Sequence, residues 1–292
     1  MAKVVYFENP LLYKPYLILG FEGWPNAAEV SSFAIRYLVE NLEAKRFASI
    51  AKEDFYEMTS ARPVAVIKEG RLTELKVPRN QFYYSNDRLP RNLILFEGIE
   101  PHLRWTSYVD CLFDMVERFD VEQIFTIGGT YDYIPHTYPA LVSAVFNDEN
   151  LGEKVSQAGL ALTDYTGPIS IHTFIMEKAR KKGVKAVSLW GHAPQYLRGR
   201  NVKVVHALLK GLSDLMGMEI DLSELRRSSE YFDQQVNHLV EQDPKLQEVI
   251  GKLEEVYQQS GRGPLARKDE GQKDEKVVYI QAFLKRQDDE EG

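Results

Sequence analysis

The sequence predicts an α/β protein with a mostly parallel central sheet, an antiparallel excursion at one edge and a C-terminal helical extension. Short β-branched runs alternate with longer segments of helical period, the pattern of strand–helix units around a buried sheet. Between residues 47 and 85 the pattern changes to polar alternation, and after Asp221 the strand signal disappears. These three observations divide the chain into a core and additions to it.

Four apolar runs are the clearest strands, at residues 16–19, 92–96, 122–127 and 185–190. Their continuous apolar character is typical of central strands that are covered on both faces. Residues 64–67 and 72–75, joined by the turn Glu69-Gly70, predict a hairpin at a sheet edge.

Helical spacing is strongest over residues 105–119, where one apolar stripe should lie against the sheet. A second helix is predicted over residues 26–41, because Asn26 and Glu29 have the spacing of a capping box. Two more helices follow at 221–241 and 243–259, separated by Asp243-Pro244.

We expect a core domain over residues 1–220, a helical extension over 221–259, a charged linker over 260–276 and a docking segment over 277–292. The linker is rich in Gly and charged residues, as expected of a flexible segment. The last helix carries an apolar stripe that must cover either the α/β body or another subunit. Its members are Leu246, Val249, Ile250, Leu253, Val256 and Tyr257.

The chain has 43 acidic and 36 basic residues, a net charge of −7, and no concentrated basic patch. This balance argues against nucleic acid as a partner. No apolar run approaches the length of a membrane span. The single cysteine, Cys111, cannot form an intramolecular disulfide and is expected to pack beside the apolar helix stripe. The sequence therefore predicts a cytoplasmic protein without a membrane segment.

Four loops after predicted strands or turns have unusual composition, and ligands of open parallel sheets bind at such strand ends. The first contains Gly20, Gly23 and Trp24 before a helix, where backbone N–H groups can receive an anion or carboxylate. A tight strand-to-helix turn explains the same glycines without a ligand.

The second loop gathers Glu97, Glu100, His102 and Arg104, residue types used in acid/base catalysis and in binding metals or carboxylates. The alternative is a solvated helix entry, in which Pro101 begins the turn and Arg104 pairs with Glu100.

The third loop offers Gly128 and Gly129 for close backbone approach, with Asp132 and His136 for polar contact. The fourth contains His192, which is either structural or a ligand-binding residue. We find no dinucleotide-binding, phosphate-loop, zinc-protease, nucleophile-elbow or calcium-loop motif, so no metal site is predicted and the cofactor stays unknown.

The order of the loops resembles the proteasome assembly chaperone family of the second-subunit type, in its bacterial and archaeal branch. The matching motifs are Gly20-Phe21-Glu22-Gly23-Trp24, Glu100-Pro101-x-x-Arg104-Trp105, Gly128-Gly129, Pro135-His136-Thr137, Tyr165-Thr166-Gly167-Pro168 and His192-x-Pro194-x-Tyr196. The resemblance covers residues 4–225 and implies a three-layer α/β/α fold and homo-oligomers. Eukaryotic and archaeal relatives are non-enzymatic chaperones, whereas bacterial relatives often carry the label of ATP-grasp enzymes or carboxylate–amine ligases.

Two features depart from this family. Relatives tend to have a compact Pro-His-Tyr where this chain has His192-Ala193-Pro194-Gln195-Tyr196, so His192 does not simply correspond to their histidine. Archaeal relatives that dock on proteasomes end in a hydrophobic residue, a tyrosine and one more residue, whereas this sequence ends Asp288-Asp289-Glu290-Glu291-Gly292.

Two functions stay open at this point. The first is a homo-oligomeric protein-binding or assembly-chaperone-like module, in which the stripe over 246–257 and the segment 277–284 cover a neighbouring subunit or partner protein. The second is a small-molecule enzyme, either a hydrolase or an ATP-dependent carboxylate–amine ligase. It would use Glu97, Glu100, His102, Asp132 and His136 around one pocket.

Overall fold

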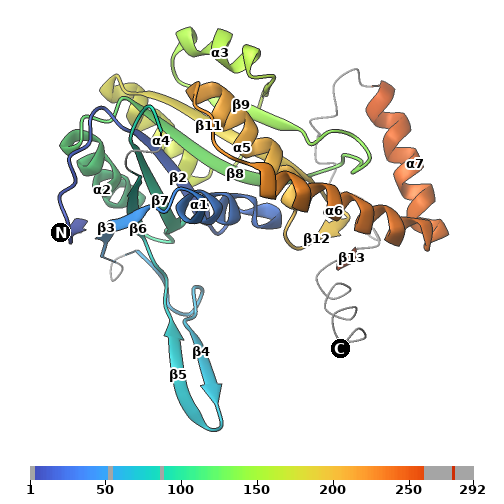
Figure 1. Cartoon of the computed structure of the whole chain (residues 1–292), viewed down its shortest axis with the longest axis horizontal. Helices are drawn as coiled ribbons and strands as arrows, with labels where there is room; N and C mark the ends of the chain where they lie inside the picture. The colour runs from blue at the N-terminus through green and yellow to red at the C-terminus, as the bar shows by residue number, and fades with distance from the viewer. Residues whose placement is uncertain (1–3, 52–54, 86–88, 260–277, 280–292) are drawn as a thin grey trace.

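The computed structural model describes residues 4–51, 55–85, 89–259 and 278–279. In these residues nine strands form one sheet, in the order β1-β3-β6-β7-β2-β8-β11-β9-β10 (Figure 1). The strands are β1 (Val4–Tyr6), β2 (Tyr16–Glu22), β3 (Lys45–Ile50), β6 (Gln81–Ser85), β7 (Leu93–Ile99), β8 (Gln123–Asp132), β9 (Val142–Phe146), β10 (Ala161–Leu162) and β11 (Lys185–Pro194).

The four central strands β7, β2, β8 and β11 are parallel, and they begin within one residue of the four runs predicted from the sequence. The strands beside them are mainly antiparallel: β6, β3 and β1 continue the sheet beyond β7, and β9 lies antiparallel to β11. The last strand, β10, is parallel to β9. The sheet is therefore parallel at its centre, as predicted, and mixed as a whole.

Helices cover both faces of this sheet, which gives the three-layer α/β/α arrangement. On one face, α1 (Val30–Asn41) and α5 (Val202–Met216) pack on the central strands. On the other, α2 (Trp105–Arg118) and α4 (Ile171–Lys182) bury a second apolar cluster. The predicted stripe on residues 105–119 is the buried face of α2. A short helix, α3 (Gly152–Gln157), follows β9.

The beginning of α1 differs from the prediction. The α-helix begins at Val30 after a short 3₁₀ turn, Ala27–Glu29, and Glu29 has a left-handed φ of 54°. Asn26 makes no capping box with Glu29; instead its side-chain oxygen accepts a hydrogen bond from the backbone N–H of Ser32, at 2.9 Å. Because the backbone kinks at Glu29, Asn26 and Glu29 do not form the predicted capping box.

The predicted hairpin is formed by β4 (Val64–Lys68) and β5 (Arg71–Lys76). Glu69 and Gly70 turn it with φ values of 50° and 76°, the left-handed pair of a tight hairpin turn. The strands do not join the large sheet; they make a separate two-stranded ribbon that extends away from the body (Figure 1).

Two helices form the C-terminal part of the described chain, α6 (Ser223–Glu241) and α7 (Pro244–Gln259), and they lie together at one end of the molecule (Figure 1). Ile250 of α7 packs with Phe232 and Val236 of α6 and with Tyr196 and Leu197, the latter in β12 (Leu197–Arg198). Part of the apolar stripe predicted on 246–257 therefore covers its own chain: Leu246 and Ile250 are buried, whereas Val256 is 53% exposed.

Within the expected docking segment 277–292, only Val278 and Tyr279 are among the described residues. They form β13 (Val278–Tyr279), which pairs in parallel with β12. The remainder of that segment and the whole of the expected linker, 260–276, lie outside the described residues.

Candidate functional site

The four loops singled out by their composition begin at one edge of the sheet. Strands β2 and β7 end in register, with Glu22 opposite Ile99, and β8 and β11 end with Asp132 opposite Pro194. Because all four strands are parallel, their carboxyl ends and the loops that follow share this edge.

Glu100 fastens two of these loops together. Its carboxylate accepts hydrogen bonds from the backbone N–H groups of Trp24, at 3.2 Å, and of Ile171 at the start of α4, at 2.8 Å. Burial raises the pKa of this carboxyl, and the two N–H groups oppose that shift. We expected a backbone N–H group of the first loop to bind the carboxylate of a ligand. In the structure, the N–H of Trp24 donates to the carboxylate of Glu100 in the same chain.

The glycines predicted to line a ligand site have packing reasons for their positions. Gly23 has a φ of +107°, and a Cβ on it would lie 3.1 Å from Cβ of Glu100. A Cβ on Gly129 would lie 2.5 Å from the carbonyl oxygen of Ala27. Gly20 and Gly128 are likewise closed in, the first by α1 and the second by α4 and a tryptophan of β11. Only Gly23 has the positive φ of a tight turn, whereas Gly20, Gly128 and Gly129 lie inside strands and are closed in by their neighbours.

Glu97 takes part in a charged cluster on β7. Its Oε1 lies 3.7 Å from Nη1 of Arg36, which also pairs with Glu22 at 3.1 Å. Burial raises the pKa of Glu97, opposed by Arg36, and burial beside Glu97 raises the pKa of Tyr83 to about 12. Glu97 is thus neutralised by Arg36 rather than directed toward Glu100.

His102 and Arg104 lie on the exposed surface of the second loop. The Nδ1 atom of His102 accepts the backbone N–H of Glu57 at 3.3 Å, and its ring meets Tyr56 edge-on at 5.9 Å. Arg104 has a left-handed φ of 55° immediately before α2. Both residues belong to the helix entry that the sequence left as the alternative.

His136 holds the C-terminal helices against the strand ends. The hydroxyl of Tyr196 accepts the backbone N–H of His136 and lies 2.7 Å from Nδ1 of its ring. The Nε2 atom lies 3.1 Å from Oδ1 of Asn237 on α6, and Lys203 of α5 donates to the His136 carbonyl at 2.6 Å. Burial lowers the pKa of His136. Each polar atom of this histidine therefore has a partner within the chain.

Asp132 and His192 meet at the ends of β8 and β11. The Nδ1 atom of His192 lies 2.8 Å from Oδ2 of Asp132, and its Nε2 lies 2.8 Å from the hydroxyl of Ser143 on β9. All three residues are buried. Sequence reasoning selected the first two and missed Ser143, which stands inside an apolar strand without any local signal.

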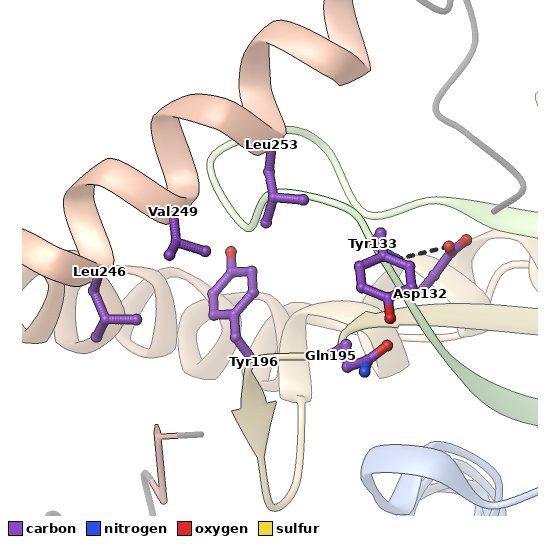
Figure 2. A pocket seen from close by; sticks show the side chains of 7 residues that line it. All are labelled: Asp132, Tyr133, Gln195, Tyr196, Leu246, Val249 and Leu253. Atoms are coloured by element: carbon purple, nitrogen blue, oxygen red, sulfur yellow. Dashed lines mark hydrogen bonds between the residues drawn. The ribbon is translucent and has the colours of Figure 1, made fainter. Parts of the chain in front are cut away.

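A small pocket lies between these strand ends and α7 (Figure 2). Apolar side chains of α7 form one wall, and residues of the β8 and β11 ends form the other. The lining residues are Asp132, Tyr133, Gln195, Tyr196, Leu246, Val249 and Leu253. Of the five residues predicted for catalysis, this pocket contains Asp132 alone; Glu97, Glu100, His102 and His136 each contact different partners and do not converge around it.

The described residues also bear on metal binding and membrane insertion. They contain no cluster of three or more His, Cys, Asp or Glu side chains arranged to hold a metal ion. No helix among them has the length and apolar character needed to cross a membrane. Cys111 is buried on α2, and burial raises the pKa of its thiol to about 11, which fits the packed residue expected from the sequence.

Comparison with known proteins places the chain in a family. The profile of the PAC2 family matches residues 20–240. A PAC2 family protein from Streptomyces avermitilis is 31% identical, with a TM-score of 0.72, and the match covers 80% of this chain and 99% of that one. A proteasome-assembly chaperone homologue from Mycobacterium tuberculosis is 26% identical, with a TM-score of 0.73 and coverages of 80% and 99%.

The archaeal proteasome activator PbaB from Pyrococcus furiosus has the same fold, at 22% identity and a TM-score of 0.64, with 82% of this chain and 98% of that one covered. No curated protein matches the sequence. The profile match over most of the chain and the Streptomyces structure agree on one assignment. The chain therefore belongs to the PAC2 family.

Proposed function

We propose that this protein is a cytoplasmic, homo-oligomeric protein-binding module of the assembly-chaperone type. Two proteins of similar structure support the proposal. One is described as a proteasome-assembly chaperone homologue and the other as a proteasome activator. The arrangement of the strand-end loops supports it too, because most polar residues there contact backbone groups or side chains of neighbouring elements. They hold loops in place instead of surrounding a substrate-sized cavity.

The observation that carries the proposal is the hairpin β4–β5. Four of its large apolar side chains, Val64, Ile67, Leu72 and Leu75, are between 54% and 64% exposed. A two-stranded hairpin is marginally stable in water unless a face of it is covered. An apolar ribbon that extends from the body is therefore a surface for association.

The charge of this ribbon favours a second copy of the same chain as its partner. Residues 62–79 contain five Lys or Arg and two Glu, within a chain whose net charge is −7. A basic, apolar arm is thus attracted to the acidic body of another copy. The arm also reaches away from its own body (Figure 1), so a neighbouring body is the surface within its reach.

A second apolar area is placed to bind a protein partner. Trp24 and Ile169 are exposed beside the two backbone N–H groups that Glu100 holds, and Leu103 is exposed three residues after Glu100. Because one carboxylate fixes both loops, these side chains are presented by a preorganised surface, which lowers the entropy lost on binding. Trp is also frequent among residues that dominate interface energetics.

Light scattering during size-exclusion chromatography tests the homo-oligomer. We expect full-length protein to elute as a multimer, and the double variant Ile67→Ser/Leu72→Ser to elute at lower mass. Leu11→Ser is the matched control, because Leu11 is 95% exposed outside the arm and should leave the mass unchanged.

A truncation after Gln259 separates the arm from the chain beyond α7. If the arm mediates association, the truncated protein forms a multimer with the same number of subunits as the full-length protein. Monomeric full-length protein, or a multimer unaffected by the double variant, would contradict the role given to the hairpin. A pull-down with wild type and Trp24→Ser then tests whether a partner protein depends on the second area.

A further inference from the structure

Asp132, His192 and Ser143 form a hydrogen-bonded relay across three adjacent strands, β8, β11 and β9. A carboxylate can only accept, so Nδ1–H of His192 donates to Oδ2 of Asp132 across 2.8 Å. The unprotonated Nε2 is then left to accept the hydroxyl hydrogen of Ser143, again across 2.8 Å. This is the order of groups that makes a serine hydroxyl nucleophilic.

We propose that Ser143 is a base-activated nucleophile that attacks small esters with an apolar acyl group. The proposal is independent of the association through the hairpin. It is also distinct from the acid–base set expected from the sequence, of which it retains only Asp132.

The base is held in position from both ends. The second oxygen of Asp132 accepts the backbone N–H of Tyr133 at 2.8 Å, which fixes the carboxylate. The backbone N–H of His192 donates to the carbonyl of Leu141 at 3.0 Å. Since both strands belong to the rigid centre of the sheet, the imidazole is oriented before any substrate arrives.

A purely structural pairing of strands does not require these groups. On the same face of the sheet, Thr126 donates to Ser188 at 2.7 Å, and Trp190 donates to Ser188 at 3.0 Å. These neighbouring hydrogen bonds join β8 to β11 with neutral groups alone. Burying a carboxylate and an imidazole costs more free energy than burying hydroxyls. Strand pairing alone therefore does not explain why Asp132 and His192 are buried here.

Ser143 has apolar neighbours on its own face of the sheet. It pairs with Trp190 across the sheet, and α4 packs on β11. Two residues farther along β9 on the same face, Val145 is 42% exposed. The apolar neighbours Trp190 and Val145 suit an apolar acyl group.

Ser143 itself is 2% exposed, so a substrate reaches it only after a local movement. The segment best placed to move is 163–169, which joins β10 to the start of α4 without regular structure. Residues 164–169 are exposed, and β10 itself is paired beside Ser143 through Ala161.

The reaction has two balanced steps. Oγ of Ser143 forms a bond to the ester carbonyl carbon while its proton moves to Nε2 of His192. The ester C–O bond then breaks, and the leaving alkoxide takes that proton as an alcohol. Water, deprotonated by His192, hydrolyses the acyl-serine and returns the hydroxyl to Ser143.

The experiment is labelling of full-length protein with an alkyl fluorophosphonate, followed by intact-mass and peptide mass spectrometry. The reagent forms a phosphorus–oxygen bond with an activated serine and releases fluoride. We expect one adduct, on Ser143, abolished in Ser143→Ala. In His192→Ala the labelling rate should fall about 100-fold or more, the usual contribution of a general base. Hydrolysis of p-nitrophenyl butyrate should fall in parallel.

The matched control is Ser188→Ala, which removes a buried hydroxyl from the neighbouring strand and should keep the adduct. Circular dichroism and thermal unfolding identify which variants fold. Wild-type protein that stays unlabelled overturns the proposal without reference to any variant. So does an adduct that persists in Ser143→Ala, or one whose rate is unchanged in folded His192→Ala.

Discussion

Lowering the pH from 7.5 to 5.0 should destabilise the protein by about 2 kcal/mol through His172 alone. His172 stands in the first turn of α4 and is 1% exposed. Its ring lies 5.5 Å from Phe21 and 5.0 Å from Trp190, between centroids, and neither ring nitrogen has a hydrogen-bond partner among the described residues. Burial lowers the pKa of this imidazole from 6.5 to about 3.

The sign and size follow from these two pKa values. The unfolded chain binds a proton near pH 6.5 and the folded protein does not until about pH 3, so stability is complete above pH 6.5 and falls below it. At pH 5.0 the unfolded imidazole is 1.5 units below its pKa, and each unit is worth about 1.4 kcal/mol. At pH 3 the loss reaches about 4 kcal/mol.

Urea unfolding at pH 7.5 and 5.0 measures this loss when wild type is compared with His172→Leu. Leucine has a similar volume and no ionisable group, so any packing cost is the same at both pH values and cancels. We expect the variant to lose about 2 kcal/mol less than wild type over this range. Met176→Leu, one turn away on the same buried face of α4, is the control and should keep the wild-type pH dependence. An identical pH dependence in wild type and His172→Leu would refute the reasoning.

Three further substitutions test the contacts at the strand ends. Tyr196→Phe leaves the buried N–H of His136 without an acceptor and should cost about 1–3 kcal/mol; faster hydrogen exchange in α7 checks it, and unchanged exchange would contradict it. Gly129→Ala places a Cβ 2.5 Å from a backbone oxygen and should lower the Tm, whereas Gly251→Ala on α7, with no atom within 4 Å, should not. Glu100→Ala removes the acceptor of two backbone N–H groups and should cost about 1–3 kcal/mol in urea unfolding; a smaller loss than that of Glu97→Ala would argue against it.

The sequence was most informative where one residue pattern has one physical explanation. Apolar runs of 4–6 residues predicted the four central strands, because a strand covered on both faces has no polar side. The stripe over 105–119 predicted α2 to within one residue of its end, Arg118. The turn Glu69-Gly70 predicted the hairpin, since its two residues take the left-handed backbone that this turn needs.

Patterns with two explanations were not resolved by sequence alone. The stripe on 246–257 fits either an intramolecular or an intermolecular surface, and the structure shows the former through contacts with Tyr196 and Phe232. The start of α1 differs from the prediction because a 3₁₀ turn and the left-handed backbone of Glu29 separate Asn26 from the first helical residue, Val30. The hairpin was placed at the sheet edge, although nothing in its alternation states whether another strand pairs with it.

The contacts of the strand-end loops were the least predictable. Glu100 accepts from Ile171, which is 71 residues away, and His192 contacts Ser143 across 49 residues. Alternating strands and helices predict which loops share an edge, but not which side chains meet there. Ser143 was missed for this reason: its significance comes from the antiparallel pairing of β9 with β11.

The polar residues at this edge differ in whether an atom remains that could react with a substrate. Glu100 and His136 are occupied by backbone groups and neighbouring side chains, and replacing either should change stability before it changes any reaction. The relay ends differently, in the hydroxyl of Ser143, an atom that can form a covalent bond. Loss of stability in Asp132→Asn therefore cannot decide its role, because a structural and a chemical relay both predict it. The covalent adduct decides, since only an activated Ser143 forms it.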